Sequence, residues 1–424
     1  MKRLLLATAV IGSILMAGAA FAAVPQPVSG SLTGFDIKAV YVSGVSSGGY
    51  LANQLHVAHS GTVKGAAIFT AGPYNCAQGS VSTAQFACMQ TYQPRRTPAR
   101  LVQETRDRAA RGTVDPVAGL RDSKVYLYHG TSDNTVVAAV NDDLAAYYRE
   151  FGAKVVYDNA TAAGHGWVSP LGSVACSSTA SPFINNCRND PERDLLAHLL
   201  GGVQPAAGST GGKLIRFDQN VYAGGAAASI GMDANGFVYV PSGCAAGRAC
   251  TLLVALHGCK QGYGYNGFGE TFMRDAYLNE YADTNDIVVL YPQAIPAPSL
   301  GNPNGCWDWW GYTGTSYAEH AGPQVKAIMG MVRALSSDKP PTTTTAPPTT
   351  TTVTPTTTTT TTPPTPVCVK ASNYDHTVAG RAYHSGGYTF ANGSNDAMGL
   401  WNTFVVHSLK RTGENHWVLA DGQC

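Results

Sequence analysis

Apolar residues in the main part of the chain gather in short β-branched runs that alternate with longer helix-like stretches. Strands that alternate with helices in this way predict an α/β domain built on a mainly parallel sheet. The strand-like runs span residues 38–43, 124–129, 154–158, 251–256 and 287–291, and the helix-like stretches span residues 49–59, 141–151 and 322–336.

A segment rich in Thr and Pro divides the chain into two parts of unequal size. Residues 340–367 are almost wholly Thr and Pro, and such a composition cannot bury enough apolar surface to fold. Because proline stiffens the backbone, we expect an extended linker here. The linker separates the large α/β domain at residues 23–339 from a small C-terminal module at residues 368–424.

The N-terminus has the features of a secretory signal peptide over residues 1–22. Lys2 and Arg3 precede an apolar run at 4–16, and Ala-Phe-Ala at 20–22 fits the small-residue rule for cleavage. A membrane anchor would need about 20 apolar residues, and no later segment is apolar for that long. We therefore expect a secreted protein, extracellular or alternatively periplasmic, with no membrane contact after cleavage.

Cysteine usage agrees with export. The chain has ten cysteines, and several lie in close pairs, which suggests disulfides in an exported protein. No CxxC or CxxH pair supports a zinc site. A disulfide between Cys368 and Cys424 would close the C-terminal module end to end. The other cysteines are at positions 76 and 88, 176 and 187, 244 and 250, and 259 and 306.

Charge narrows the range of partners. Charged residues make up 13% of the chain and the net charge is +1. Because no long basic run follows the first residues, nucleic acid is not an expected partner. Low charge suits a protein that works on a neutral polymer, although many secreted proteins are equally poor in charge.

The sequence GVSSG at 44–48 has the GxSxG form of a nucleophile elbow. A strand-like run ends at Ser43 and a helix-like stretch begins at Gly49, which is the setting that an elbow requires. We therefore predict Ser46 as the nucleophile and the N–H of Ser47 as an oxyanion donor. Ser43 and Ser47 are weaker nucleophile candidates, because neither has glycine two residues away on both sides.

A serine nucleophile needs a base and an acid that orients the base. Asp133 lies in the loop HGTSDNTV, directly after a predicted strand, whereas the competing acids Asp142 and Asp143 fall in a helix-like stretch and are interpreted as surface residues. His165 lies between two glycines in the loop AGHGW after the next strand. The order Ser, Asp, His at successive strand ends predicts a catalytic triad. His56, His59 and His198 lie in helix-like stretches, where packing or exposure is the simpler interpretation.

The second oxyanion donor is predicted to be the N–H of Cys259. The run LLVAL leads into His257-Gly258-Cys259, and an HG turn after a buried strand is the usual source of this donor in α/β-hydrolases. Alternatively, His257 is only a buried residue that closes the strand. Pairing of Cys259 with Cys306 would pin the turn.

The order of these elements along the chain is unusual. The HG strand normally precedes the nucleophile elbow, but here it follows the elbow, and the helix-like stretch at 322–336 closes the domain instead of leading into the nucleophile strand. The simplest account is a circularly permuted α/β-hydrolase fold. Such permutation is tolerated because domain termini often lie close together.

Six motifs in combination resemble the fungal-type poly(3-hydroxybutyrate) depolymerases, which are circularly permuted members of the PHB-depolymerase esterase family. The match covers roughly residues 30–336. The motifs are GVSSGGY at 44–50, HGTSDNTV at 129–136, AGHGW at 163–167, LLVALHGCKQ at 252–261, LYPQA at 290–294 and NGCWDWW at 304–310.

The resemblance implies a serine esterase that hydrolyses an insoluble polyester without a metal or cofactor, and we expect a monomer. It also implies that Trp307 lines the crevice that admits a single polymer chain. Because the motif here reads WDWW, which ring touches the substrate stays open. The implied catalytic residues are Ser46, Asp133 and His165, and the implied oxyanion hole is formed by the N–H groups of Ser47 and Cys259.

Two other functions remain open on the residues alone. One is an acetyl-xylan or feruloyl esterase acting on plant polysaccharide, which shares the same chemistry; the permuted order and the CWDWW motif favour polyester over it. The other is a non-catalytic adhesion protein, against which a complete triad argues. The aromatic residues of the C-terminal module would form either an adsorbing face or a small core; they are Tyr374, Tyr383, Tyr388, Trp401 and Trp417.

Overall fold

The computed structural model describes residues 24–336, 368–385, 388–402, 404–413 and 416–422. They fall into two compact units, one before the Thr/Pro-rich segment and one after it. The predicted signal peptide and the whole of the predicted linker lie outside the described residues. So does Cys424, the predicted partner of Cys368. Within the described ranges, no helix is long and apolar enough to cross a membrane.

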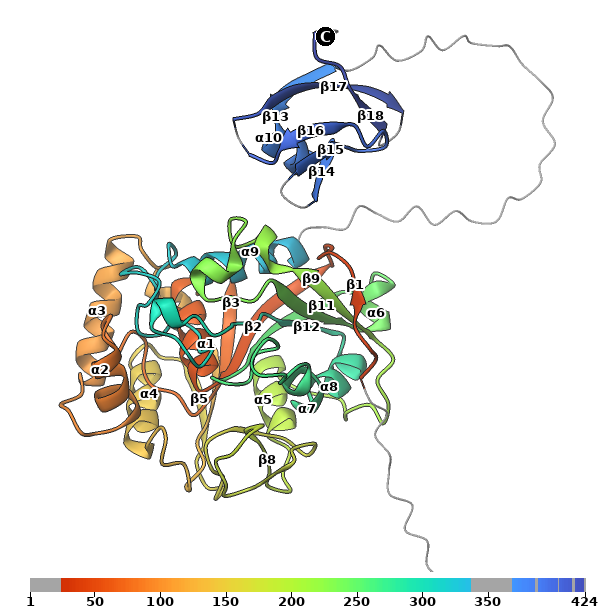
Figure 1. Cartoon of the computed structure of the whole chain (residues 1–424). Helices are drawn as coiled ribbons and strands as arrows, with labels where there is room; N and C mark the ends of the chain where they lie inside the picture. The colour runs from red at the N-terminus through yellow and green to blue at the C-terminus, as the bar shows by residue number, and fades with distance from the viewer. Residues whose placement is uncertain (1–23, 337–367, 386–387, 403, 414–415, 423–424) are drawn as a thin grey trace, which may run out of the picture. The chain divides into compact units, whose positions relative to one another are not determined.

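The larger unit is built on one nine-stranded sheet (Figure 1). Every pair of neighbouring strands is parallel except the two pairs that β10 makes with β9 and β12, so the predicted mainly parallel sheet is confirmed. In spatial order the strands are β1 (Val28–Ser29), β9 (Lys213–Asp218), β10 (Asn235–Val240), β12 (Ile287–Tyr291), β11 (Cys250–Leu256), β2 (Ile37–Val45), β3 (Val63–Phe69), β4 (Lys124–Tyr128) and β5 (Lys154–Asp158).

The centre of the sheet joins two distant parts of the chain. Strand β11 pairs in parallel with β2, with Leu253 opposite Tyr41. The Ser43 hydroxyl donates to the carbonyl of Val254, 211 residues further along the chain, over 3.4 Å. The HG turn after β11 and the elbow after β2 therefore meet at the same sheet edge, as the permuted order predicted.

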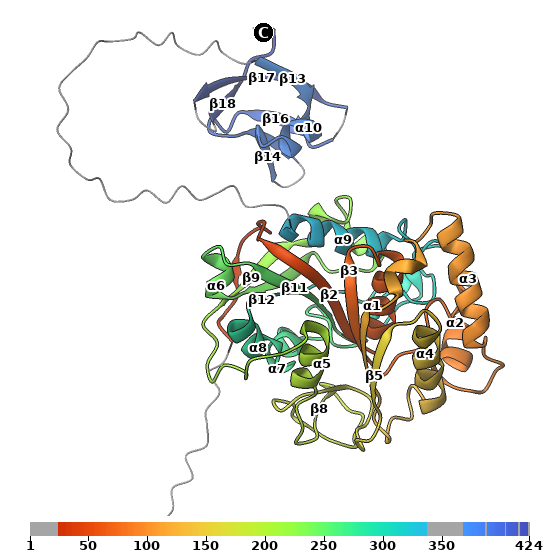
Figure 2. The same cartoon turned by 180° about the vertical axis from the view of Figure 1, so that it is seen from behind.

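Helices cover both faces of the sheet (Figures 1 and 2). Successive strand residues such as Leu253 and Val254 enter different apolar cores, because strand side chains alternate between faces. One core contains residues of α1 (Ser47–Ala58), α3 (Pro98–Ala110), α4 (Ala138–Glu150) and α9 (Pro323–Ser336), and the other contains residues of α5 (Pro191–Leu200), α7 (Thr271–Asp275) and α8 (Leu278–Asn285).

Disulfides and short elements fix the loops of this unit. Among the described residues, the three close cysteine pairs form the disulfides Cys76–Cys88, Cys176–Cys187 and Cys244–Cys250, and Cys259 pairs with the more distant Cys306. The short elements include α2 (Val81–Thr83), the π-helical turn η1 (Ala84–Met89), α6 (Ser242–Ala245), and a small sheet of β6 (Trp167–Val168), β8 (Ile184–Asn186) and β7 (Val174–Ala175).

The C-terminal unit consists of two three-stranded sheets and one short helix. Its buried apolar core is small and contains Ala382, Ala391, Met398 and Leu409. One sheet has β13 (Cys368–Ser372), β17 (Val406–Gly413) and β18 (His416–Leu419), the other has β14 (Ala382–Ser385), β15 (Tyr388–Ala391) and β16 (Ala397–Leu400), and the helix is α10 (Asn373–Val378).

Candidate active site

Ser46 lies in a sharp turn between β2 and α1. Its backbone has φ 56° and ψ −123°, a conformation that L-residues rarely adopt. Strain of this kind concentrates at functional sites, where the surrounding structure holds it. Here the Ser46 N–H donates to the Phe69 carbonyl over 3.0 Å, and the Tyr50 N–H donates to the Ser46 carbonyl over 3.0 Å.

The two glycines of the GxSxG motif allow close backbone contacts around this turn. A Cβ on Gly44 would lie 2.3 Å from the Gly48 carbonyl oxygen. A Cβ on Gly48 would lie 2.3 Å from the Leu256 carbonyl oxygen, at the end of β11. The motif therefore packs the start of α1 directly against the strand that carries the HG turn.

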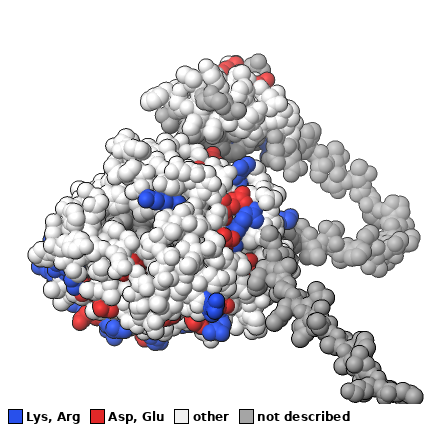
Figure 3. Space-filling view, turned by 60° about the horizontal axis from the view of Figure 1, so that its bottom comes forward, with Lys and Arg blue, Asp and Glu red and all other residues white. Residues whose placement is uncertain are grey.

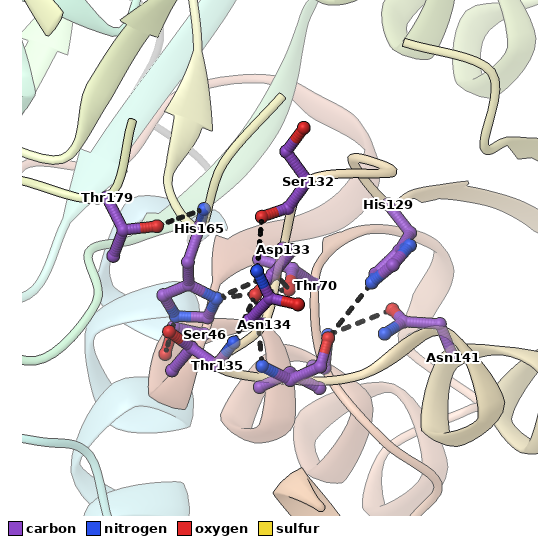
Figure 4. A network of polar contacts seen from close by, with 12 residues as sticks. Ser46, Thr70, His129, Ser132, Asp133, Asn134, Thr135, Asn141, His165 and Thr179 are labelled. Atoms are coloured by element: carbon purple, nitrogen blue, oxygen red, sulfur yellow. Dashed lines mark hydrogen bonds and ion pairs between the residues drawn. The ribbon is translucent and has the colours of Figure 1, made fainter. Parts of the chain in front are cut away.

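The structure brings Ser46, Asp133 and His165 into one hydrogen-bonded chain (Figure 4). Nε2 of His165 lies 2.9 Å from the Ser46 hydroxyl, and its Nδ1 lies 2.8 Å from Oδ2 of Asp133. The serine follows β2, the aspartate follows β4, and the histidine follows β5, so all three stand at the carboxyl ends of parallel strands. A serine, an imidazole and a carboxylate in this order form the arrangement of a nucleophile, a base and an orienting acid.

The acid is held in its charged form. Asp133 is 4% exposed, and burial alone would raise the pKa of its carboxyl. Hydrogen bonds from His165, Thr70 and the Val136 N–H outweigh burial and lower the pKa below its ordinary value. The N–H groups of Thr135 and Val136 donate to Oδ1 over 2.8 and 3.0 Å, which leaves Oδ2 for the imidazole.

Thr70 is a residue of this site that the sequence did not reveal. It follows β3, has φ 47°, and its hydroxyl donates to Oδ2 of Asp133 while lying 3.2 Å from Nδ1 of His165. Thr70 therefore fixes the carboxylate oxygen that faces the imidazole. The only signal in the sequence is its place at the end of the strand between the nucleophile and acid strands.

Two backbone N–H groups beside Ser46 are available to a ligand. Within the described part of the chain, neither the Ser47 N–H nor the Cys259 N–H has a hydrogen-bond acceptor. The turn that carries Cys259 lies close to Ser46. A Cβ on the preceding residue, Gly258, would be 3.4 Å from Cβ of Ser46. The Cys259–Cys306 disulfide holds the turn. His257 is fully buried, as the alternative interpretation of this residue expected.

Ser46 and His165 open onto a cavity of about 530 Å³ with a largely apolar wall. The wall includes Phe183, Trp309 and Trp310. Two groups of metal-ligand side chains occur among the described residues, and neither includes a residue that lines this cavity. One group is His59, Asp115 and His320; the other combines Asp286 with two cysteines that form a disulfide.

The comparisons with known proteins agree with this geometry. A poly(3-hydroxybutyrate) depolymerase of Delftia acidovorans is 36% identical over 90% of this chain and 92% of its own length. The chain belongs to the poly(3-hydroxybutyrate) depolymerase family. A polyhydroxybutyrate depolymerase of Talaromyces funiculosus is 36% identical over 74% of this chain and 94% of its own length. No family model matches the chain.

Solved depolymerase structures share the fold of the larger unit. A PHB depolymerase complexed with an R3HB trimer matches with a TM-score of 0.66 and 34% identity, over 73% of this chain and 99% of its own. The crystal structure of the PHB depolymerase from Penicillium funiculosum matches with a TM-score of 0.66 and 33% identity over the same shares. The circularly permuted α/β-hydrolase fold and the ester hydrolase class expected from the sequence are thereby confirmed.

The depolymerase resemblance placed Trp307 in the crevice, but the structure places it in the core. Trp307 is fully buried, and its indole N–H donates to the His257 carbonyl over 2.9 Å. The neighbouring rings of Trp309 and Trp310 line the cavity instead. The Trp309 ring stacks on Tyr50 with ring centroids 3.9 Å apart. Trp307 therefore packs against the turn that contains His257, and Trp309 and Trp310 line the cavity.

Proposed function

We propose that the protein is a secreted serine esterase that hydrolyses poly(3-hydroxybutyrate), or a related short-chain polyhydroxyalkanoate, through an acyl-enzyme. The observation that carries this proposal is the chain of contacts from Ser46 to His165 to Asp133 at the mouth of an apolar cavity. Relatives named as depolymerases of this polymer span most of the chain. One chain supplies every group in the site, which fits a monomer.

Acylation follows from the positions of these groups. His165 takes the proton of Ser46 on Nε2, and the alkoxide attacks the ester carbonyl. The N–H groups of Ser47 and Cys259 stabilise the oxyanion, each such donor being worth about 3 kcal/mol of transition-state stabilisation. Asp133 keeps the proton of the imidazole on Nδ1 and stabilises the imidazolium.

Collapse of the tetrahedral intermediate releases the products in two steps. The alcohol end of the polymer leaves with the proton that His165 carries, and the acyl group stays on Ser46. Water then attacks the acyl-enzyme while His165 accepts its proton. His165 returns this proton to the Ser46 oxygen as the acyl–serine bond breaks, and a chain ending in a 3-hydroxyacyl carboxylate is released.

Clearing of a poly(3-hydroxybutyrate) suspension tests the substrate and the nucleophile together. We expect the wild-type protein to clear the suspension and Ser46→Ala to fold but leave it turbid. Acetylated xylan and a feruloyl ester serve as parallel substrates. Release of acetate or ferulate without clearing would indicate an esterase that acts on plant polysaccharide instead. Full activity of Ser46→Ala would contradict the assignment of Ser46 as the nucleophile.

We also propose that residues 1–22 are a signal peptide, that residues 340–367 are a linker and that the C-terminal module adsorbs to polymer. The module exposes large apolar side chains, among them Tyr388 at 54% and Phe404 at 90%. Deletion of residues 340–424 should weaken pelleting with polymer granules while hydrolysis of a soluble ester persists. Unchanged pelleting would show that the C-terminal module is not needed for adsorption to the polymer.

A further inference from the structure

Lys260 lines the active-site cavity and brings a positive charge to it. Of the residues that line the cavity in the described part of the chain, Lys260 is the only Lys, Arg, Asp or Glu. Its side chain is exposed, and its ammonium has no hydrogen bond or ion pair with any described residue. Figure 3 shows that one broad face of the larger unit carries few charged side chains.

The backbone of Lys260 is fixed at a specific place beside the reacting atoms. It directly follows Cys259, whose disulfide to Cys306 holds the turn. The Lys260 N–H donates to the Asn304 carbonyl over 2.8 Å, and its φ is 65°. Glycine adopts this conformation without strain, whereas lysine adopts it at a conformational cost. Such strain is typical of residues that have a functional role.

The proposed reaction supplies an anion that fits this cation. Each cleavage of a polyester leaves a chain with a terminal carboxylate, and soluble oligomers carry the same group. In the acylation step the acyl-enzyme keeps the hydroxyl end of the chain, so the carboxyl end leaves with the alcohol product. A cation at the edge of the cavity can therefore recognise that end before cleavage and hold it until release.

We propose that Lys260 binds the terminal carboxylate of the polyester chain or oligomer and thereby favours cleavage close to the carboxyl end. This proposal rests on the proposed function. Because the ammonium is exposed, its ion pair with the carboxylate is screened by water and salt, and we expect a roughly two- to fivefold effect on binding.

The test compares the free acid of a 3-hydroxybutyrate trimer with its methyl ester, which lacks the negative charge at the carboxyl end and carries one additional methyl group. The rate is measured as cleavage of the ester bonds between the 3-hydroxybutyrate units, not of the methyl ester. We expect wild type to have the higher kcat/KM for the acid, mostly through KM, and added salt to reduce this preference. Lys260→Met should lower the acid-to-ester ratio of kcat/KM roughly two- to fivefold, and Lys260→Arg should retain it. The matched control is Lys326→Met, an exposed lysine of α9 that does not line this cavity, which should keep the wild-type ratio.

An unchanged acid-to-ester ratio of kcat/KM in Lys260→Met would overturn the proposal. If both kcat/KM values also fell by the same factor, Lys260 would have only a role in shaping the turn. Failure of the proposed function is distinguishable from both. In that case wild type would hydrolyse neither trimer, or Ser46→Ala would hydrolyse both as well as wild type does.

Discussion

The hydroxyl of Thr70 donates a hydrogen bond to Oδ2 of Asp133, the same carboxylate oxygen that lies 2.8 Å from the imidazole of His165. A buried carboxylate that must orient an imidazole has to be held on both oxygens. The loop N–H groups hold Oδ1, and Thr70 holds Oδ2. Thr70 therefore acts on catalysis through Asp133 and His165, without contact with the nucleophile in the structure.

Thr70→Val should lower kcat by roughly tenfold and leave KM unchanged, because one hydrogen bond to a charged group is lost. Valine is branched at Cβ like threonine, so this substitution should leave the unusual backbone conformation of residue 70 almost unchanged. Thr70→Ser keeps the hydroxyl and should retain most of the activity. Equal loss in both variants, measured on a soluble ester, would show that packing rather than the hydrogen bond matters.

Asp133→Asn should reduce kcat by about 10⁴-fold without unfolding the protein. An amide can keep the bonds from the Thr135 and Val136 N–H groups on its oxygen, but its NH₂ would face Nδ1 of His165. The imidazole would then carry its proton on Nε2 and could not accept the proton of Ser46. Circular dichroism would check the fold, and a soluble ester would report kcat. A loss smaller than tenfold would mean that another group orients His165.

Substitutions of Trp307 and of Trp310 in the WDWW motif should have different effects. Trp307→Phe removes a buried indole and its bond to the His257 carbonyl, so we expect a loss of roughly 2–4 kcal/mol of unfolding free energy. Trp310→Ala opens the cavity wall and should raise KM with little loss of stability. Urea unfolding and steady-state kinetics on oligomers measure the two effects. A higher KM without loss of stability in Trp307→Phe would instead indicate that Trp307 contacts the substrate.

The sequence could predict those features that depend on short local patterns. Strands such as β12 (Ile287–Tyr291) are unbroken β-branched and apolar runs, and the loops of Asp133 and His165 follow strands directly. Strand β3 (Val63–Phe69) was missed, because Lys64 and Gly65 interrupt the run and alanines weaken it. Without β3, the position of Thr70 at a strand end could not be recognised.

The orientation of the WDWW rings could not be predicted, because it depends on contacts that form only in the folded chain. Asp308 is buried, and its carboxylate accepts the N–H groups of residues 311, 312 and 313 over 2.7 to 3.0 Å. This turn fixes the segment so that Trp307 faces the core and Trp309 stacks on Tyr50. Only the folded chain brings Tyr50 and the core beneath Trp307 together.

A buried histidine gives the protein a specific acid sensitivity. His56 is fully buried, lies 3.0 Å from the Tyr148 hydroxyl through Nδ1, and burial lowers its pKa to about 3 from an ordinary 6.5. Between these values the unfolded chain binds more protons at this residue than the folded one. The stability that neutral His56 contributes is therefore present above pH 6.5 and is lost as the pH falls toward 3.

His56→Gln should be less stable than wild type at pH 7, and the difference should shrink by about 2 kcal/mol at pH 5, since one pKa unit corresponds to about 1.4 kcal/mol. Urea unfolding followed by circular dichroism at both pH values measures the difference. The comparison with wild type is needed because burial raises the pKa of Glu280 to about 7, which gives an opposite slope that is common to both proteins. A difference that stays constant between pH 7 and pH 5 would mean that His56 titrates alike in the folded and unfolded chains.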